Sequence, residues 1–465
     1  MAATIKLALA TLAVALPLAA QAQSETNLRA LRGLVPIVAL AGTPAGRAAL
    51  DANMRVTSGI QTGAIRQPFL MPFAEQQQHA IRDAFITDGN ATQLADALGT
   101  TLGGVYGEKA RYSDPHTFTS IGPAVEKLVG YTNDVTKSDS NSGKFFFANR
   151  TVDGTKPVSD RAVEILSDVK GEVDTFGRAY GRPAGSPGAD KFGNSRPFQT
   201  ASNLLAYRGT TYFGAATHTI DWLRGPRQNL TDSPSYPSGH TTYGYTESML
   251  LALLVPERYS QMVARAAEYG NNRIVIGAHY AMDVLGGRSL SLHALAHLLA
   301  NDPAYVGRPR ENPAIENAMG QNTSAPVQVT DYPALLKAAR SELKAFLEER
   351  CGSAIATCAA KDESRFRDTA AVAAMYDSTL TYALPVVHES AASRKADVAK
   401  DAPEAGYLIT AAFPKVTLAE AHAILTQTLA LGGGFLDSGS EFGIYSRLNL
   451  YAAGGKAAAL EASRR

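Results

Sequence analysis

The sequence predicts an all-α protein, and two observations support this fold class. Apolar residues recur at helical spacing over long runs, and the stripe in residues 158–180 consists of Val163, Ile165, Leu166, Val169, Val173 and Phe176. Proline, glycine and helix-start residues punctuate the chain between such runs. We therefore expect helices near residues 72–85, 91–98, 158–180, 247–254, 257–272, 283–300, 332–350 and 418–431.

The first residues have the pattern of a secretory signal peptide, which we assign to residues 1–22. Lys6 forms a short basic region, an apolar run follows, and Ala20-Gln21-Ala22 matches a cleavage site of small residues. The apolar run is shorter than the roughly 18–20 residues that span a bilayer. We expect a periplasmic or secreted protein with no integral membrane segment in its mature chain.

Residues 23–155 are expected to form an N-terminal helical extension. Within it, residues 132–154 are rich in Asp, Ser, Asn, Thr and Lys, a composition that favours a surface loop. This stretch carries Lys144 and Arg150 around three phenylalanines, 145–147, which we expect to be buried under the loop rather than at a substrate entrance. His79 and His116 have no partner at ligand spacing, so we expect structural roles for both.

A turn at residues 234–244, which contains Pro234 and Pro237, leads into a Leu-rich segment expected to be helical. Pro237 cannot continue a helix from before it, Ser238 is a favoured N-cap, and Gly239 allows another group to approach the backbone. The free amides of the first turn and the helix dipole favour an anion there. His240 adds a proton donor or acceptor, so the turn is a candidate oxyanion site.

A second segment, residues 272–283, supplies a histidine with a carboxylate to orient it. His279 and Asp283 are four residues apart, so in a helix the carboxylate would lie on the same face as the imidazole. An aspartate bonded to one ring nitrogen leaves the other as a lone-pair nucleophile. Arg273 would be a forked, permanently charged phosphate ligand.

Two further cations lie upstream. Lys191 and Arg196 flank the sequence Phe192-Gly193-Asn194-Ser195, whose backbone can wrap an oxyanion. Together with Arg273 they would make a local cation cluster in a chain whose overall charge is balanced, with 44 basic against 43 acidic residues. Because the charges balance, the protein as a whole has no positive electrostatic field that would attract nucleic acid or an anionic membrane.

These residues resemble the type 2 phosphatidic acid phosphatase superfamily, which includes bacterial nonspecific acid phosphatases and vanadium haloperoxidases. The family pattern has three blocks, Lys-x6-Arg-Pro, Pro-Ser-Gly-His and Ser-Arg-x5-His-x3-Asp. The second is intact at residues 237–240, and the third runs through residues 273–283 with Asn272 in place of serine. The first is shorter here, because only four residues separate Lys191 from Arg196, which changes the direction from which the lysine reaches the anion.

The resemblance implies a catalytic helical bundle over residues 156–300 and a metal-independent acid phosphatase acting through a phosphohistidine. His279 would attack phosphorus, Asp283 would orient it, and His240 would protonate the departing alkoxide and then activate water. The phosphate-binding residues implied by the family blocks are Lys191, Arg196, Ser238, Gly239 and Arg273. The expected partner is a small phosphorylated substrate.

Other functions fit the same residues. A vanadium haloperoxidase would bind vanadate through His279 with the same anion ligands. A soluble lipid phosphate or diphosphate phosphatase would use the same chemistry on another substrate, and a noncatalytic phosphate-binding protein would need no oriented histidine. The signal peptide and the sequence Tyr-Pro-Ser-Gly-His-Thr at residues 236–241 resemble those of secreted acid phosphatases. This resemblance favours a phosphatase over a haloperoxidase.

Residues 301–465 are expected to be a C-terminal appendage on the bundle. Cys351 and Cys358 are the two cysteines, and export to an oxidising compartment would allow them to form a disulfide. His293 and His297, four residues apart before this appendage, have a metal-ligand spacing, but the sequence shows no third ligand and we predict no metal. The oligomeric state is not specified by the sequence.

Overall fold

The computed structural model describes residues 23–85, 90–114, 117–201, 208–218, 230–307 and 328–464. The predicted signal peptide and His116 lie outside these ranges. The described residues fold as helices, with two short antiparallel hairpins, β1–β2 and β3–β4. The prediction of an all-α fold is therefore confirmed.

In chain order, the elements of the N-terminal part are α1 (Glu25–Leu34), η1 (Val35–Gly42), α2 (Pro44–Thr62), α3 (Phe73–Ala84), η2 (Thr92–Leu98), α4 (Thr100–Lys109), β1 (Tyr112–Asp114), β2 (Thr117–Phe118) and α5 (Pro123–Asn149). The middle of the chain forms α6 (Asp160–Val169), α7 (Thr175–Ala179), α8 (Pro197–Thr200), β3 (Arg208–Thr210), β4 (Ala216–His218), η3 (Leu230–Asp232), α10 (Gly239–Leu254), η4 (Pro256–Arg258), α11 (Tyr259–Val275) and α12 (Ala281–Leu299). The C-terminal part forms α14 (Tyr332–Cys351), α15 (Ile355–Lys361), α16 (Thr369–Thr381), α17 (Glu389–Ser393), α18 (Val398–Asp401), η5 (Pro403–Gly406), α19 (Tyr407–Thr410), α20 (Leu418–Thr428), α21 (Glu441–Arg447) and α22 (Leu450–Ala462).

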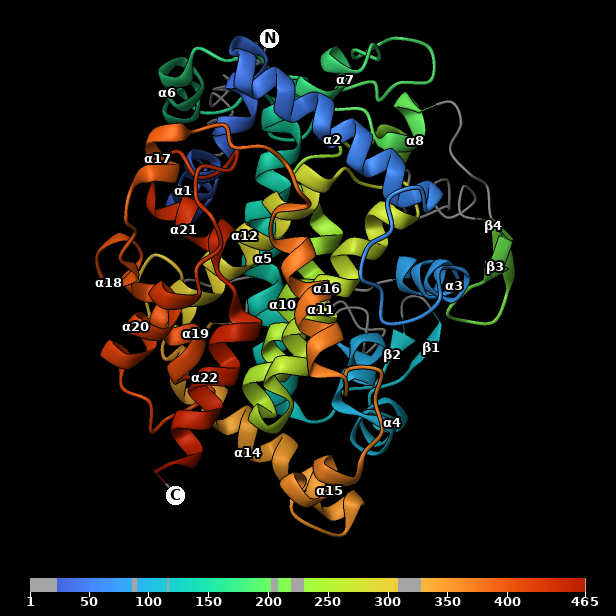
Figure 1. The fold of residues 1–465 in the computed structure, drawn as a ribbon, viewed down its shortest axis with the longest axis vertical. Helices are drawn as coiled ribbons and strands as arrows, with labels where there is room; N and C mark the ends of the chain where they lie inside the picture. The colour runs from blue at the N-terminus through green and yellow to red at the C-terminus, as the bar shows by residue number, and fades with distance from the viewer. Residues whose placement is uncertain are drawn as a thin grey trace, which may run out of the picture.

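Helix α10 lies at the centre of the molecule and packs against α5, α11 and α12 (Figure 1). Every residue of α10 and of α12 is buried, so neither helix has a solvent face. The polar side chains that these helices carry are therefore buried too, and Glu247 of α10 and Arg288 of α12 have hydrogen-bond partners inside the protein. The C-terminal helices α14 and α22 cover this bundle from outside, on α5 and α11 respectively.

Helix α5 corrects one prediction. Residues 132–149, expected in a surface loop, continue this helix, and only residues 150–154 leave it. The polar residues that suggested a loop face the interior: Asn133 Nδ2 donates to Glu247 Oε1 at 3.2 Å, and Asn27 Nδ2 donates to Asp139 Oδ1 at 2.9 Å. Phe146 is fully buried, as predicted for the aromatic run, but inside a helix.

The predicted helix at residues 158–180 is also interrupted. Helix α6 ends at Val169, because Lys170 adopts a left-handed conformation with φ 50°, and the chain resumes helical structure at Thr175. The predicted helix at residues 257–272 is longer than expected, since α11 continues to Val275. Arg273 is therefore held on a helix rather than on a loop.

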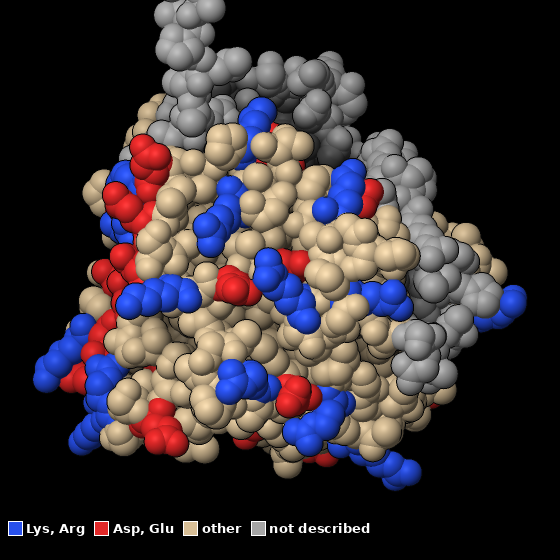
Figure 2. Space-filling view, turned by 90° about the horizontal axis from the view of Figure 1, so that it is seen from above, with Lys and Arg blue, Asp and Glu red and all other residues tan. Residues whose placement is uncertain are grey.

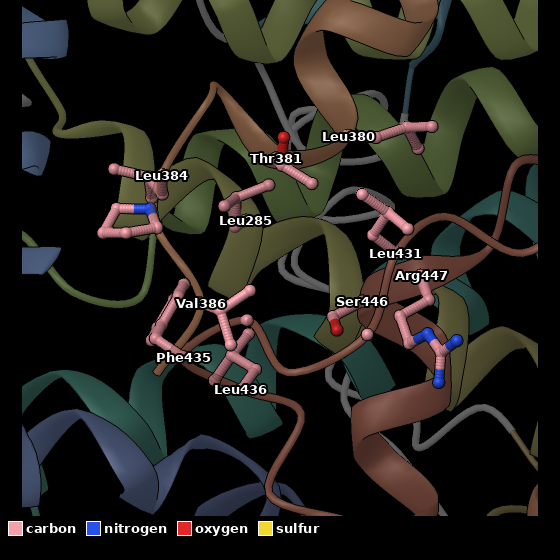
Figure 3. Close-up of a pocket in the computed structure, with 13 residues that line it drawn as sticks. Leu285, Leu380, Thr381, Leu384, Val386, Leu431, Phe435, Leu436, Ser446 and Arg447 are labelled. Atoms are coloured by element: carbon pink, nitrogen blue, oxygen red, sulfur yellow. The ribbon is translucent and has the colours of Figure 1, made fainter. Parts of the chain in front are cut away.

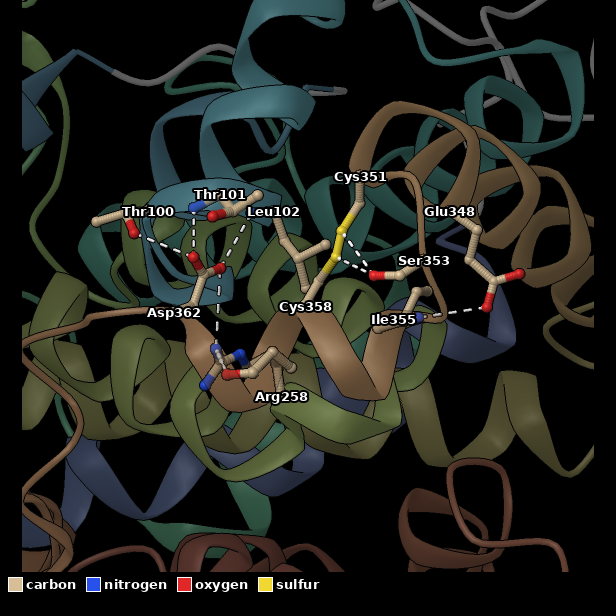
Figure 4. The surroundings of a disulfide bond; sticks show 11 residues. Thr100, Thr101, Leu102, Arg258, Glu348, Cys351, Ser353, Ile355, Cys358 and Asp362 are labelled. Carbon is tan, nitrogen blue, oxygen red and sulfur yellow. Dashed lines mark hydrogen bonds and ion pairs between the residues drawn. A yellow bond between two sulfur atoms is a disulfide. The ribbon is translucent and has the colours of Figure 1, made fainter.

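The C-terminal part is joined to the rest of the chain by polar contacts as well as apolar ones. Cys351 and Cys358 form a disulfide, as expected (Figure 4). Close to it, the Asp362 carboxylate accepts the backbone N–H groups of Thr101 at 2.7 Å and Leu102 at 3.1 Å. An aspartate from the C-terminal part therefore caps the N-terminus of α4.

C-terminal residues also close over helix α12. Leu285 of α12 lines a small, mainly apolar pocket of about 120 Å³ with Leu380, Val386 and Leu436 (Figure 3). Arg288, on the same helix, donates to the carbonyl oxygen of Leu380 at 3.0 Å. The segment after residue 328 thus packs directly on the helix that carries Asp283.

Among the described helices, none is by itself long and apolar enough to cross a membrane, although Glu25–Gly42 and Pro44–Thr62, bent by 100°, meet that criterion as a pair. On the face shown in Figure 2, basic and acidic side chains are interspersed, with neither sign gathered into one large patch. This distribution agrees with the balanced composition.

Candidate active site

The first turn of α10 is built as the sequence predicts. The Ser238 side chain accepts the backbone N–H of Thr241 at 3.1 Å, and the helix begins at Gly239. A side chain at residue 239 would crowd the site, because a Cβ built there would lie 3.1 Å from Lys144 Nζ. Glycine thus leaves the most room for the Lys144 side chain beside the helix N-terminus.

His279 is oriented by Asp283, as expected, but not across a helical turn. Helix α12 begins at Ala281, after His279, and Asp283 Oδ2 accepts the Tyr280 backbone N–H at 2.8 Å as part of a capping box. The same oxygen lies 3.2 Å from His279 Nδ1 and also accepts a hydrogen bond from the Ser235 hydroxyl. With Nδ1–H facing this carboxylate, Nε2 of His279 carries the lone pair.

Arg196 fixes the other side of the His279 ring. Its Nη1 lies 3.0 Å from His279 Nε2 and donates to the Ala278 carbonyl oxygen at 2.9 Å. Its Nε donates to the Ser233 carbonyl oxygen at 2.7 Å, and the residue is 1% exposed. Contacts with two backbone carbonyl groups therefore hold the guanidinium beside Nε2 of His279.

The two histidine rings lie close together in the interior. The ring centroids of His240 and His279 are 6.0 Å apart, with an interplanar angle of 57°. Both residues are buried, at 7% and 0% exposure. The rings are thus close enough to act on opposite sides of one tetrahedral group.

Burial, together with nearby positive charge, determines the protonation of this pair. Burial, and then the charges of Arg273, Lys144 and Arg196, lower the pKa of His240 well below its ordinary value. Burial, and then Arg196 and Arg273, likewise lower the pKa of His279. Both imidazoles are neutral at neutral pH in the empty site.

Asp283 responds to burial in the opposite direction. Burial raises the pKa of its carboxyl to about 7, while the hydrogen bonds from Ser235 and Tyr280 and the charge of Arg196 lower it. The carboxyl therefore titrates near neutral pH, and its ionised form is the one that accepts the His279 Nδ1–H most strongly.

The structure does not bring Lys191 into this cluster. Its side chain is 59% exposed, its Nζ lies 3.4 Å from Asp232 Oδ2, and it covers the Phe192 ring. Lys144 of α5 takes up the position beside Gly239. The sequence analysis placed Lys144 in a surface loop and gave it no role. The reason is that the polar residues of α5 in this stretch have the composition of a loop.

Asn272, which stands where the family pattern has serine, anchors α11 to α3. Its Nδ2 donates to Asp83 Oδ2 at 2.8 Å and lies 3.2 Å from His79 Nδ1. Asp83 in turn pairs with the buried Arg265. His79 thus belongs to a polar network between α3 and α11, which agrees with the structural role expected for it.

Fold and site together define a helical protein with two neighbouring imidazoles, the buried guanidiniums of Arg196 and Arg273, and Lys144 at the α10 N-terminus. A family profile for the PAP2 superfamily matches residues 189–304, which contain the three sequence blocks. The chain thus carries a PAP2 superfamily domain.

Among curated proteins, this chain is similar to bacterial acid phosphatases. It is 39% identical over 72 residues to an acid phosphatase of Zymomonas mobilis, covering 16% of this chain and 27% of that protein. It is 35% identical over 102 residues to a non-specific acid phosphatase of Salmonella typhimurium (22% and 40%), and 27% identical over 143 residues to one of Providencia stuartii (28% and 56%). The matches therefore span from about a quarter to just over half of these relatives.

Proposed function

We propose that this protein is an acid phosphatase that hydrolyses small phosphate monoesters through a phosphohistidine at His279. The observation that carries the proposal is the His279 ring, held by Asp283 at Nδ1 with its Nε2 facing the cation cluster and His240. The similarity to non-specific acid phosphatases supports the same reaction class. The predicted signal peptide supports action in the periplasm or outside the cell.

In the first step, the Nε2 lone pair of His279 attacks phosphorus, and the bond from phosphorus to the alcohol oxygen breaks. His240, protonated in the complex, gives its proton to the departing oxygen. The empty site disfavours this protonation, but a bound phosphate offsets the cations that lower the His240 pKa. Substrate binding therefore prepares the general acid.

In the second step, water attacks the phosphoryl group on His279. His240, now neutral, accepts a proton from this water, the bond from phosphorus to Nε2 breaks, and inorganic phosphate leaves. The electron pair returns to Nε2, so the enzyme is restored.

The charge on the phosphoryl oxygens is balanced by side chains in this proposal. The charges of Arg196, Arg273 and Lys144 act on both imidazoles, and the Gly239 amide and the Ser238 hydroxyl lie at the α10 N-terminus. Such preorganised charge is the main requirement of phosphoryl transfer. We assign the lysine role to Lys144 rather than Lys191, and the proposed reaction uses no metal ion.

The test is p-nitrophenyl phosphate hydrolysis by the mature chain in the presence of a chelator. His279→Ala should lower kcat by at least about 10³-fold, whereas His422→Ala, at a histidine bonded to the Pro403 carbonyl oxygen, should not. The His240→Asn variant, quenched during turnover, should accumulate a base-stable, acid-labile phosphoryl group on His279.

Two outcomes would overturn the proposal. One is substantial hydrolysis by His279→Ala, which would assign the nucleophile elsewhere. The other is bromide oxidation with vanadate and peroxide in a protein that does not hydrolyse the ester, which would make the chain a haloperoxidase.

A further inference from the structure

A second cluster of histidines lies at the other end of helix α12. His293 and His297 are four residues apart on this helix, and Glu441 is the first residue of α21. Glu441 Oε1 lies 3.6 Å from His293 Nε2 and 3.1 Å from His297 Nε2. The C-terminal part thus supplies the third ligand that the sequence did not reveal.

The remaining ring nitrogens are engaged by other partners. His297 Nδ1 lies 2.8 Å from Asp302 Oδ2, and His293 Nδ1 lies 3.3 Å from the Tyr305 hydroxyl. Metal-binding histidines usually have such a partner on the second nitrogen, which fixes the ring and its tautomer. Here both Nε2 atoms are aimed at the same carboxylate oxygen.

The spacing suits a first-row divalent cation. With bonds of about 2.0 Å, adjacent ligands of a tetrahedral zinc site are about 3.3 Å apart. The two distances from Glu441 Oε1 lie on either side of this value, and the three ligand atoms lie within 4.8 Å of one another. A small rotation of these side chains would place them around one ion.

The surroundings favour a cation and leave room for water. The ligands open into a pocket of about 470 Å³ whose lining includes the carboxylates of Asp302, Glu404 and Glu441 and the guanidiniums of Arg29 and Arg32. The carboxylates outnumber the guanidiniums, and Arg29 Nη1 is paired with Asp302 Oδ2 at 2.8 Å. A water molecule from this pocket can complete the coordination.

We propose that His293, His297 and Glu441 bind a divalent transition-metal ion of the Zn²⁺ class. The ion would connect α12, the helix that carries Asp283, to α21 of the C-terminal part. At about 1.5 Å rise per residue, His293 lies about 15 Å along the helix from Asp283. The site is therefore separate from the proposed phosphoryl site and serves to hold the C-terminal part in place.

The experiment measures metal binding rather than phosphatase activity. The full mature chain is stripped with a chelator and titrated with Zn²⁺ by calorimetry, and with Co²⁺ by visible absorption. We expect one equivalent of Zn²⁺, and Co²⁺ absorption bands typical of a four-coordinate site. Mg²⁺ and Ca²⁺ should not bind, because they prefer sites made of oxygen ligands.

Variants separate this site from adventitious binding. His293→Gln and Glu441→Gln should each lose the stoichiometric Zn²⁺ equivalent, while Asp302→Asn should weaken Zn²⁺ binding about 10–100-fold. His422→Gln, a histidine outside the cluster, should bind as the unaltered chain does. Circular dichroism checks that each variant is folded.

The inference is overturned if the unaltered chain binds no Zn²⁺. The cluster would then be held together by hydrogen bonds between the two histidines and Glu441, without a metal ion. It is also overturned if His293→Gln and Glu441→Gln bind Zn²⁺ as tightly as the unaltered chain. Neither result bears on the phosphohistidine, because His279→Ala tests that proposal separately.

Discussion

Lys144 and Lys191 provide a matched pair of lysines at the site. Lys144 Nζ lies beside the α10 N-terminus, while Lys191 pairs with Asp232 at the surface. We expect Lys144→Met to lower kcat/KM by about 10²-fold, the usual effect of losing one charged ligand of the transition state. Lys191→Met should change kcat/KM by less than about threefold, since exposed ion pairs contribute little. Steady-state kinetics with p-nitrophenyl phosphate measures both, and the reverse order would restore Lys191 to the site.

The burial of the two histidines and the positive charges beside them predict an acidic pH optimum. Since the pKa values of His240 and His279 are both lowered in the free protein, both limbs of kcat/KM should lie below about pH 6.5. Below the His279 pKa the nucleophile is protonated and activity falls. Above the His240 pKa the general acid is lost, so activity falls again.

In the kcat profile the basic limb should move to higher pH, because bound phosphate raises the His240 pKa. The control is His240→Asn, which should lose the basic limb that His240 sets and keep the acidic limb that His279 sets. A kcat/KM that stays constant from pH 6.5 to pH 8 and falls only below this range would contradict the assignment of His240.

Local sequence predicted most of the site, because its residues lie in short segments that fold locally. Ser238 and His240 belong to one helix start, and His279 and Asp283 to another. Lys144 and Glu441 could not be predicted in this way. Each is far along the chain from the residues it approaches, and only the packing of α5 and α21 brings it there.

At the scale of elements, α5 shows why polar composition is an ambiguous signal. The polar composition of residues 132–149 of α5 predicted a loop, yet several of these polar residues are buried against other polar groups. Thr136 Oγ1 and Thr246 Oγ1, for example, lie 3.2 Å apart between α5 and α10. The hydrophobic pattern alone could not distinguish a solvated segment from a helix with a buried hydrogen-bond network.

Asn133 tests that network. Asn133→Ala removes the donor at 3.2 Å from the buried Glu247 Oε1, so we expect the free energy of unfolding to fall by about 1–3 kcal/mol. Lys127→Ala, at an exposed position of the same helix, should change it by less than about 0.5 kcal/mol. Urea denaturation followed by circular dichroism compares the two. Equal effects would mean that the Asn133 hydrogen bond contributes nothing measurable.

At the scale of the whole molecule, the hydrophobic core crosses the boundaries predicted at residues 155 and 300. One cluster includes Leu128 of α5, Leu250 of α10, Leu343 of α14 and Leu450 of α22. A chain whose segments share one core should unfold cooperatively. We therefore expect the predicted extensions to unfold together with the bundle over residues 156–300.

Asp362 allows this cooperativity to be tested, because it joins α4 to the C-terminal part. Asp362→Ala removes a cap from the Thr101 and Leu102 amides and should lower the free energy of unfolding by about 1–2 kcal/mol. In a shared-core molecule, calorimetry should show one transition at a lower Tm. The control Asp368→Ala removes a local cap, that of α16, and should likewise shift one transition. If residues 301–465 were a separate unit, Asp368→Ala would move only one of two resolved transitions, and the single-unit interpretation would be wrong.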